Sequence, residues 1–176
     1  MPSARDLRLV VFLRGVNVGG HRTFRPSQLA AELSHLGCIN IGAAGTFVFN
    51  KKIPLTKLRA ELKRRLPFDT VVAVCHGENI TQLVANPPFD QRARANVVRF
   101  LTILTANTTR VAPARFPATG PWFVRVIRHQ KRFVIGEYRR HMKTIGYLGK
   151  LDQHFGVLVT TRNWNTIQLI AKVLAQ

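Results

Sequence analysis

The spacing of apolar and polar residues divides the first half of the chain into six segments. Runs that are apolar at nearly every position predict strands that are buried on both faces, and leucines three or four residues apart predict helices. Glycine and proline mark the segment ends. In chain order the predicted elements are a strand over 7–13, a helix over 26–36, two short strands within 39–50, a helix over 54–66 and a strand over 70–75. This order is typical of the ferredoxin-like (βαββαβ) fold.

The second half shows a weaker form of the same pattern. After a short linking helix over 79–85, the predicted elements are a strand over 97–105, a proline-interrupted helix over 108–116, hairpin strands 122–128 and 132–138, a helix near 147–155, a strand over 157–161 and a last helix capped by Asn165. We therefore expect an α+β protein of two small subdomains. The first is ferredoxin-like and spans 1–77, a linking helix and loop occupy 78–96, and the second, over 97–176, is a degraded version of the same pattern plus a terminal helix.

Composition adds a strong positive charge to this picture. The 176 residues include 27 Lys and Arg against 8 Asp and Glu, a formal net charge of +19, while 46% of the residues are hydrophobic. Such an apolar content is too high for a disordered basic tail, so the charge belongs to a folded protein. It indicates a polyanionic partner, with nucleic acid the first candidate.

Several other classes of protein do not fit the sequence. No apolar run approaches the roughly 18 residues of a membrane span, and the first run, over 9–13, is too short for a signal-peptide core. Cys38 and Cys75 are too few for a disulfide scaffold. We therefore expect a cytoplasmic protein with reduced thiols and no membrane partner; the pattern does not define its oligomeric state.

The glycine-rich segment RGVNVGG, residues 14–20, follows the first strand. Its candidate anion-binding residues are Arg14, Asn17, Gly19 and Gly20, because glycines allow backbone N–H groups to turn toward an anion. The alternative is a tight strand exit in which Asn17 bonds its own backbone.

The segment TTRNWNT, residues 160–166, lies just before the last helix. Arg162, Asn163 and Asn165 are candidate anion-binding residues, since a helix N-terminus beside an arginine attracts anions. The alternative is structural: Asn163 or Asn165 caps the helix, Trp164 packs in the core and Arg162 pairs with a carboxylate.

Together the two segments resemble an uncharacterised bacterial family, domain-of-unknown-function family number 1697. Its members begin with a strand that runs into RGxNVGG and finish with TTRNWNT before a last helix, as this chain does. The resemblance implies a two-subdomain α+β fold and no established activity. The family usually has a QSGNVVF-like hairpin where this chain has AAGTFVF, residues 43–49, so any activity that uses those polar side chains would be lost here. The pairing of both motifs in one family also suggests that they meet in space.

Two further features bear on nucleic-acid binding. Phe47 and Phe49 weakly resemble the aromatic pair of an RNA recognition motif, but strands that are apolar on both faces favour a covered sheet and a core position. Basic residues surround the second-half hairpin, where they can reach phosphates or form a solvated sheet edge. The nucleic-acid contact candidates are Arg128, Lys131, Arg132, Arg139 and Arg140.

The sequence gives little support for a catalytic function. The acidic residues form no close pair, Cys75 and His76 would point to opposite faces of a strand, and neither histidines nor cysteines have metal-ligand spacing. The sequence predicts no metal and no cofactor and leaves the question of catalysis open. We expect first a non-enzymatic anion- or nucleic-acid-binding protein. The alternative is an enzyme or binding protein for a small phosphorylated or carboxylated ligand held between the two motifs.

Overall fold

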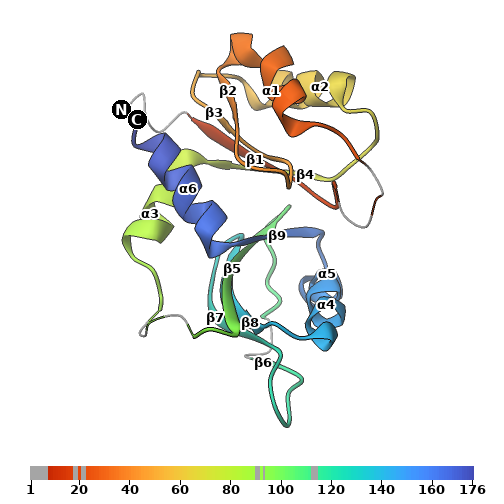
Figure 1. Ribbon diagram of the computed structural model, residues 1–176, viewed down its shortest axis with the longest axis vertical. Helices are drawn as coiled ribbons and strands as arrows, with labels where there is room; N and C mark the ends of the chain where they lie inside the picture. The colour runs from red at the N-terminus through yellow and green to blue at the C-terminus, as the bar shows by residue number, and fades with distance from the viewer. Residues whose placement is uncertain (1–7, 18–19, 21–22, 90–91, 93, 112–114) are drawn as a thin grey trace. The chain divides into compact units, whose positions relative to one another are not determined.

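The computed structural model describes residues 8–17, 20, 23–89, 92, 94–111 and 115–176. The chain forms two compact units, one of Met1–Asn86 with Gln168–Gln176 and one of Pro87–Ile167. Each unit contains an antiparallel sheet and helices, so the predicted α+β class is confirmed (Figure 1).

The first unit has its elements in the predicted order along the chain. They are β1 (Leu9–Leu13), α1 (Pro26–Glu32), the 3₁₀ helix η2 (Ser34–Leu36), β2 (Cys38–Asn40), β3 (Thr46–Phe49), α2 (Leu55–Arg65), β4 (Val72–His76) and α3 (Gly77–Ala85). The strands pair antiparallel in the order β2-β3-β1-β4. Helices α1 and α2 lie on one face of this sheet (Figure 1).

The hydrophobic periodicity explains the packing of this unit. Leu29, Leu58 and Leu62 point from the helices into a core that contains Phe47 and Phe49, both with no exposed surface. The core position expected for the two phenylalanines is thus confirmed. Burial at every position of β1 and β3 accounts for their lack of polar alternation.

A glycine joins α3 closely to the end of α6 (Trp164–Leu174) within the same unit. A Cβ atom at Gly77 would lie 2.8 Å from Leu174 Cδ2. A larger residue at this position would require the end of the Leu174 side chain to move.

The second unit contains four strands before its first helix. Its elements are β5 (Val97–Leu104), β6 (Arg115–Phe116), β7 (Val124–Gln130), β8 (Phe133–Arg139), α4 (Met142–Gly149), α5 (Leu151–Phe155), β9 (Val159–Asn163) and the first turn of α6. The strand order is β6-β7-β8-β5-β9, all antiparallel.

Two predictions for this half need correction. The helix expected over 108–116 is wrong, because the described residues of that segment contain no helix and end in β6; prolines at 113 and 117 remove the backbone donors that a helix requires. The hairpin exists, but its turn is Lys131-Arg132 rather than 129–131. Lys131 adopts a φ of 53°, the conformation that a two-residue turn needs.

One face of the second sheet forms the core of this unit beneath α4 and α5 (Figure 1). Phe100, Val124 and Val134 project from the strands toward Leu151 and Phe155 of α5. Gly136 makes this packing possible, since a Cβ there would lie 2.3 Å from the Arg125 carbonyl oxygen and 2.6 Å from the Phe100 ring. A β-bulge between Val126 and Arg128 interrupts the register at this point.

Candidate nucleic-acid interface

The opposite face of the second sheet carries a row of charged side chains across four strands. Arg115 of β6 pairs with Arg125 of β7, Arg125 with Glu137 of β8, and Glu137 with Arg99 of β5. Residues paired across antiparallel strands project their side chains from the same face. We call these four residues the arginine row. Three strand spacings of about 4.8 Å make the row about 14 Å long.

Glu137 holds two members of the row in place. Arg125 donates from Nε and Nη2 to Glu137 Oε2 at 3.0 and 2.6 Å, and Arg99 donates from Nε to Oε1 at 3.3 Å. The carboxylate is only 7% exposed, whereas Arg125 is exposed. One buried acid therefore fixes two guanidinium groups at the surface and leaves the row with a positive surplus.

Aromatic rings also contact the guanidinium groups of Arg99 and Arg125, and that of Arg139. The Cζ of Arg99 lies 4.3 Å from the ring centroid of Phe89, and the Cζ atoms of Arg125 and Arg139 lie 4.8 and 4.4 Å from that of Trp122. Arg139 is two residues beyond Glu137 on β8 and so shares its face. Cation–π contacts of this kind orient guanidinium planes while their N–H edges can serve an anion.

Three members of the arginine row, Arg99, Arg125 and Glu137, line an open groove of about 390 Å³ within the second unit. Arg92 and Arg94 join Arg99 and Arg125 in its lining, with Phe89, Trp122 and Ile127 as its apolar part. Among the described lining residues Glu137 is the only acid. Positive charge beside aromatic surface is the composition expected of a nucleic-acid site.

The hairpin residues predicted from the sequence fall into two groups. Lys131 and Arg132 form the turn, while Arg139 and Arg140 lie at the far end of β8. Seven residues separate these ends, about 23 Å of strand. Arg128 pairs with Ile135 and therefore shares the face of the arginine row. Arg128 and Arg139 thus belong with the row, whereas the turn residues are remote from it along the strands.

Sequence reasoning did not select most of the groove. The sequence does not single out Arg99 and Arg115, because strand pairing supplies their neighbours. Phe89 and Trp122 lie outside the strands and meet their arginines through ring contacts that sequence spacing does not specify. The only available signal was the recurrence of arginine within segments that are otherwise strand-like.

The RGVNVGG loop belongs to the first unit, and Asn17 ties it to neighbouring loops. Asn17 has a φ of 55°; its Nδ2 donates to the Ala43 carbonyl at 2.9 Å, and its Oδ1 accepts from the Phe24 N–H at 2.9 Å. The carbonyl of Arg14 accepts from Thr70 Oγ1. Gly20 has a φ of 76°, and Gly19 lies outside the described residues. Both polar atoms of the Asn17 side chain thus have structural partners, and anion binding by this loop stays a prediction.

In TTRNWNT, Asn163 is the helix cap. Its Oδ1 accepts from the backbone N–H and the hydroxyl of Thr166 at 2.9 and 3.0 Å. The helix begins at Trp164, which is 6% exposed, so the prediction that Asn165 caps it is wrong; Asn165 lies in the first turn and faces solvent. The reason is that Asn163 is the last extended residue of β9, where the chain turns.

Arg162 is largely buried within the same motif. It is 8% exposed and donates from Nη1 to Thr160 Oγ1 and to the Thr161 carbonyl. Burial lowers the pKa of its guanidinium to about 10. Arg162 lies in the second unit and RGVNVGG in the first, so the meeting of the two motifs stays a prediction.

Across the described parts of the chain, no helix combines the length and the apolar character that a membrane crossing requires. No three histidine, cysteine or acidic side chains among those same residues are grouped closely enough to hold a metal ion.

Comparison with known proteins identifies a family. A model described as "Protein of unknown function (DUF1697)" matches residues 7–121, a range that includes RGVNVGG and ends before TTRNWNT. No curated protein matches the chain. Among solved structures, the conserved bacterial protein SP0830 from Streptococcus pneumoniae has a TM-score of 0.63 and 18% identity, covering 95% of this chain and 98% of that one; at this identity the likeness concerns the fold. Because the family model matches more than half of its length, the chain belongs to the DUF1697 family of proteins of unknown function.

Proposed function

We propose that the protein is a non-enzymatic nucleic-acid-binding protein and that the arginine row, with Arg139 and the adjoining groove, contacts the phosphates. The observation that carries the proposal is the row itself, in which three arginines and one glutamate occupy paired positions on four strands.

The length of the row favours a polyanion over a small anion. A single phosphate or carboxylate needs only one or two guanidinium groups, whereas this row extends about 14 Å across the sheet. A strand of nucleic acid presents successive phosphates over such a distance. The second-unit groove, with Arg92 and Arg94 in its lining, adds charge beside the row.

The fixed orientation of the arginines also supports the proposal. Glu137, Phe89 and Trp122 hold guanidinium groups in place before any ligand arrives. Less side-chain entropy is then lost on binding than with freely rotating lysines.

The direct test is fluorescence anisotropy of a labelled single-stranded oligonucleotide at two or more salt concentrations. We expect binding at low salt that weakens steeply as salt rises, since phosphate contacts release counterions. The informative variant is Arg115→Gln with Arg139→Gln. We expect it to weaken binding several-fold and to reduce the salt slope by about 0.7 for each phosphate that the variant no longer neutralises.

A matched control distinguishes binding at the arginine row from nonspecific attraction to the net positive charge of the protein. Lys57→Gln with Lys63→Gln removes the same charge from exposed positions of α2 in the first unit. If both double variants weaken binding equally, net charge rather than the arginine row governs binding. If the unaltered protein binds no nucleic acid at low salt, the proposal is wrong.

A further inference from the structure

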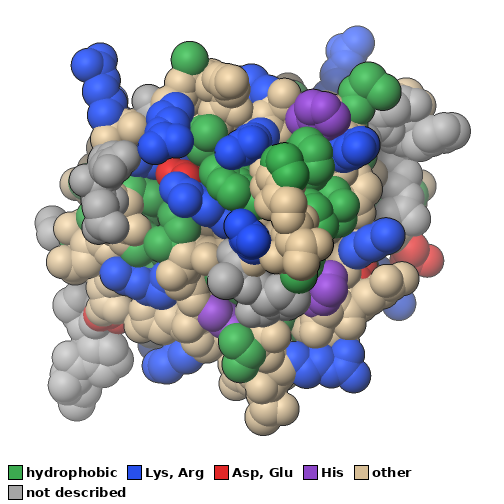
Figure 2. All heavy atoms as spheres, turned by 90° about the horizontal axis from the view of Figure 1, so that it is seen from below, with side chains coloured by type: hydrophobic (Ala, Val, Ile, Leu, Met, Phe, Trp, Pro, Cys, Tyr) green, Lys and Arg blue, Asp and Glu red, His purple; other side chains and the backbone are tan. Residues whose placement is uncertain are grey.

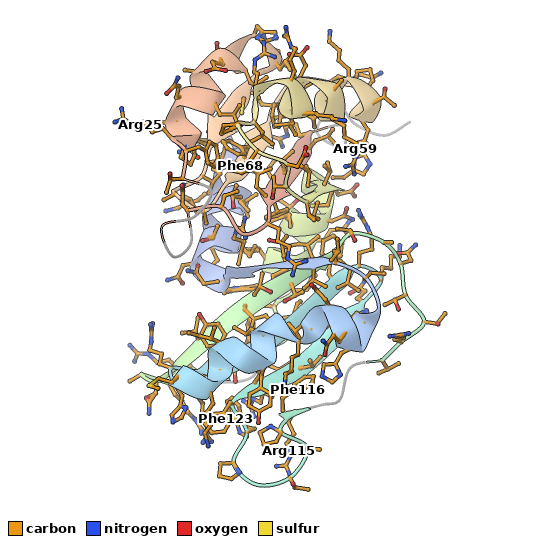
Figure 3. The ribbon with its side chains drawn as sticks, turned by 90° about the vertical axis from the view of Figure 1, so that its right-hand side faces the viewer. Arg25, Arg59, Phe68, Arg115, Phe116 and Phe123 are labelled. Carbon is orange, nitrogen blue, oxygen red and sulfur yellow. The ribbon has the colours of Figure 1, made fainter. Side chains whose placement is uncertain are left out.

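The second unit also contains a continuous series of contacting aromatic rings beside α4. His154 contacts Phe116 at a centroid distance of 4.5 Å, Phe116 contacts Tyr147 at 6.4 Å, Tyr147 contacts Phe123 at 5.9 Å and Phe123 contacts His141 at 4.7 Å. We call these five residues the ring ladder. Phe116 and Phe123 lie on the same side of the unit (Figure 3).

The ladder runs from the half-buried ring of His154, past the buried ring of Phe116, to the surface at His141. Phe116 is buried, Tyr147 and Phe123 are half-buried, and His141 is exposed. Tyr147 and Phe123 are nearly parallel, with an interplanar angle of 9°. On the face seen in Figure 2, histidine and hydrophobic side chains lie among lysines and arginines, and few acidic side chains are visible. The half-buried rings of Tyr147 and Phe123 and the exposed ring of His141 present aromatic surface at one end of the ladder.

We infer that the exposed end of the ladder, Phe123 with His141, is a base-stacking site for single-stranded nucleic acid. The inference rests on the proposed function, because the arginine row would hold the phosphates of the same strand. Stacking on aromatic side chains needs an unpaired base with a free face, which a duplex does not present.

The chain connects this end directly to the arginine row. Trp122, whose ring contacts Arg125 and Arg139, immediately precedes Phe123. The N–H of Arg139 donates to the Phe123 carbonyl at 2.8 Å. Arg139 and Phe123 therefore meet at one end of the sheet, with the Arg139 side chain on the face of the arginine row and the Phe123 ring on the α4 face. A single strand that passes around this end of the sheet would contact both.

Local contacts hold the exposed end in a fixed geometry. His141 is the N-cap of α4, and its Nδ1 accepts from the Lys143 N–H at 3.1 Å. The Lys143 ammonium lies 5.7 Å from the Phe123 ring centroid. The Lys143 ammonium lies beside the rings, where it can pair with a phosphate group. This charge favours binding of a nucleotide over binding of an uncharged ligand of aromatic sites, such as a proline-rich peptide.

The test uses two ligands, a single-stranded oligonucleotide of about 10 nucleotides and inorganic polyphosphate, which has charge but no bases. The variants are Phe123→Leu, which keeps an apolar side chain without a ring, and His141→Asn, which keeps a capping oxygen without a ring. We expect each to weaken oligonucleotide binding about tenfold. Polyphosphate binding and the salt slope should not change.

The control is His154→Asn, which removes the ring at the other end of the ladder and should leave oligonucleotide binding unchanged. Equal losses for oligonucleotide and polyphosphate, equal losses in the control, or no loss in either ring variant would overturn the inference and leave the proposed function standing. Failure of the unaltered protein to bind either ligand at low salt would overturn both. If Phe123→Leu does not fold, His141→Asn decides the question, because its change is at an exposed position.

Discussion

The two sheets of this protein use similar strands in different ways. In the first sheet, β1 and β3 are buried at every position and consist almost entirely of apolar residues. In the second, β7 is buried only at Val124, and its other positions are half-buried or exposed. These two strands of the first sheet therefore contribute packing, whereas β7 of the second sheet also presents charged side chains.

The location of positive charge differs in the same way. In the first unit a dense basic cluster lies on the solvent face of α2, where Glu61 pairs with Arg64 and Arg65 on the same helix. In the second unit the arginines project from the strands themselves and meet across them through Glu137. Glu137 is more deeply buried than Glu61, so solvent screens its two ion pairs less. The proposed nucleic-acid contact therefore rests on the second unit.

Removal of a core ring from the first sheet should produce the largest effect. Phe47→Ala should lower the free energy of unfolding by about 3–5 kcal/mol, because it leaves a cavity at a position with no exposed surface. Ile127→Ala on β7 is the comparison, since Ile127 is 38% exposed and lines the groove. Its cost should stay below about 1 kcal/mol. Chemical denaturation measures both, and equal losses would contradict the contrast between the sheets.

Neutralisation of Glu137 should separate stability from binding. Glu137→Gln should lower the free energy of unfolding by about 1–2 kcal/mol, since Arg99 and Arg125 lose a charged partner and Arg125 is partly screened by solvent. Affinity for an oligonucleotide at low salt should nevertheless rise several-fold, because a negative charge leaves the row. Denaturation and anisotropy measure the two effects. If affinity falls instead, Glu137 is needed to position the arginines for phosphate.

Glu61→Gln is the matched control in the first unit. Hydrogen bonds from Arg64, together with the charges of Arg64 and Arg65, lower the pKa of Glu61. Any stabilisation it provides is therefore present at neutral pH and lost as pH falls through that lowered pKa. The group is on a helix surface and screened by solvent, so we expect its removal to leave stability at neutral pH nearly unchanged.

The sequence predicted the first unit well because its signals are local. The spacing of Leu58 and Leu62 defines a helix face within a few residues, and Gly37, with a φ of 71°, ends the preceding helical segment as expected. The β7–β8 hairpin of the second unit was predicted for the same reason. Its turn was misplaced because Lys131-Arg132 carries none of the Asn-Gly or Asp-Gly signals of a two-residue turn.

The arginine row could not be predicted because it depends on register. Arg99 and Glu137 are 38 positions apart, and only the pairing of β5 with β8 places them opposite each other. A shift of one residue would move either side chain to the other face of the sheet. The aromatic partners, Phe89 and Trp122, lie outside the strands, although the predicted hairpin strand over 122–128 included Trp122.

The last comparison concerns the end of the second sheet, where β9 continues into α6. Asn163→Ala should lower the free energy of unfolding by about 1 kcal/mol, because the Thr166 N–H and hydroxyl lose their acceptor. Asn165→Ala, at an exposed position inside the helix, should change it by less than about 0.5 kcal/mol. Neither change should alter oligonucleotide binding if the arginine row is the site, since neither residue lines its groove. A loss of binding in Asn163→Ala without a matching loss of stability would instead indicate that TTRNWNT contacts the ligand, and the division between a packing sheet and a binding sheet would then have to include β9.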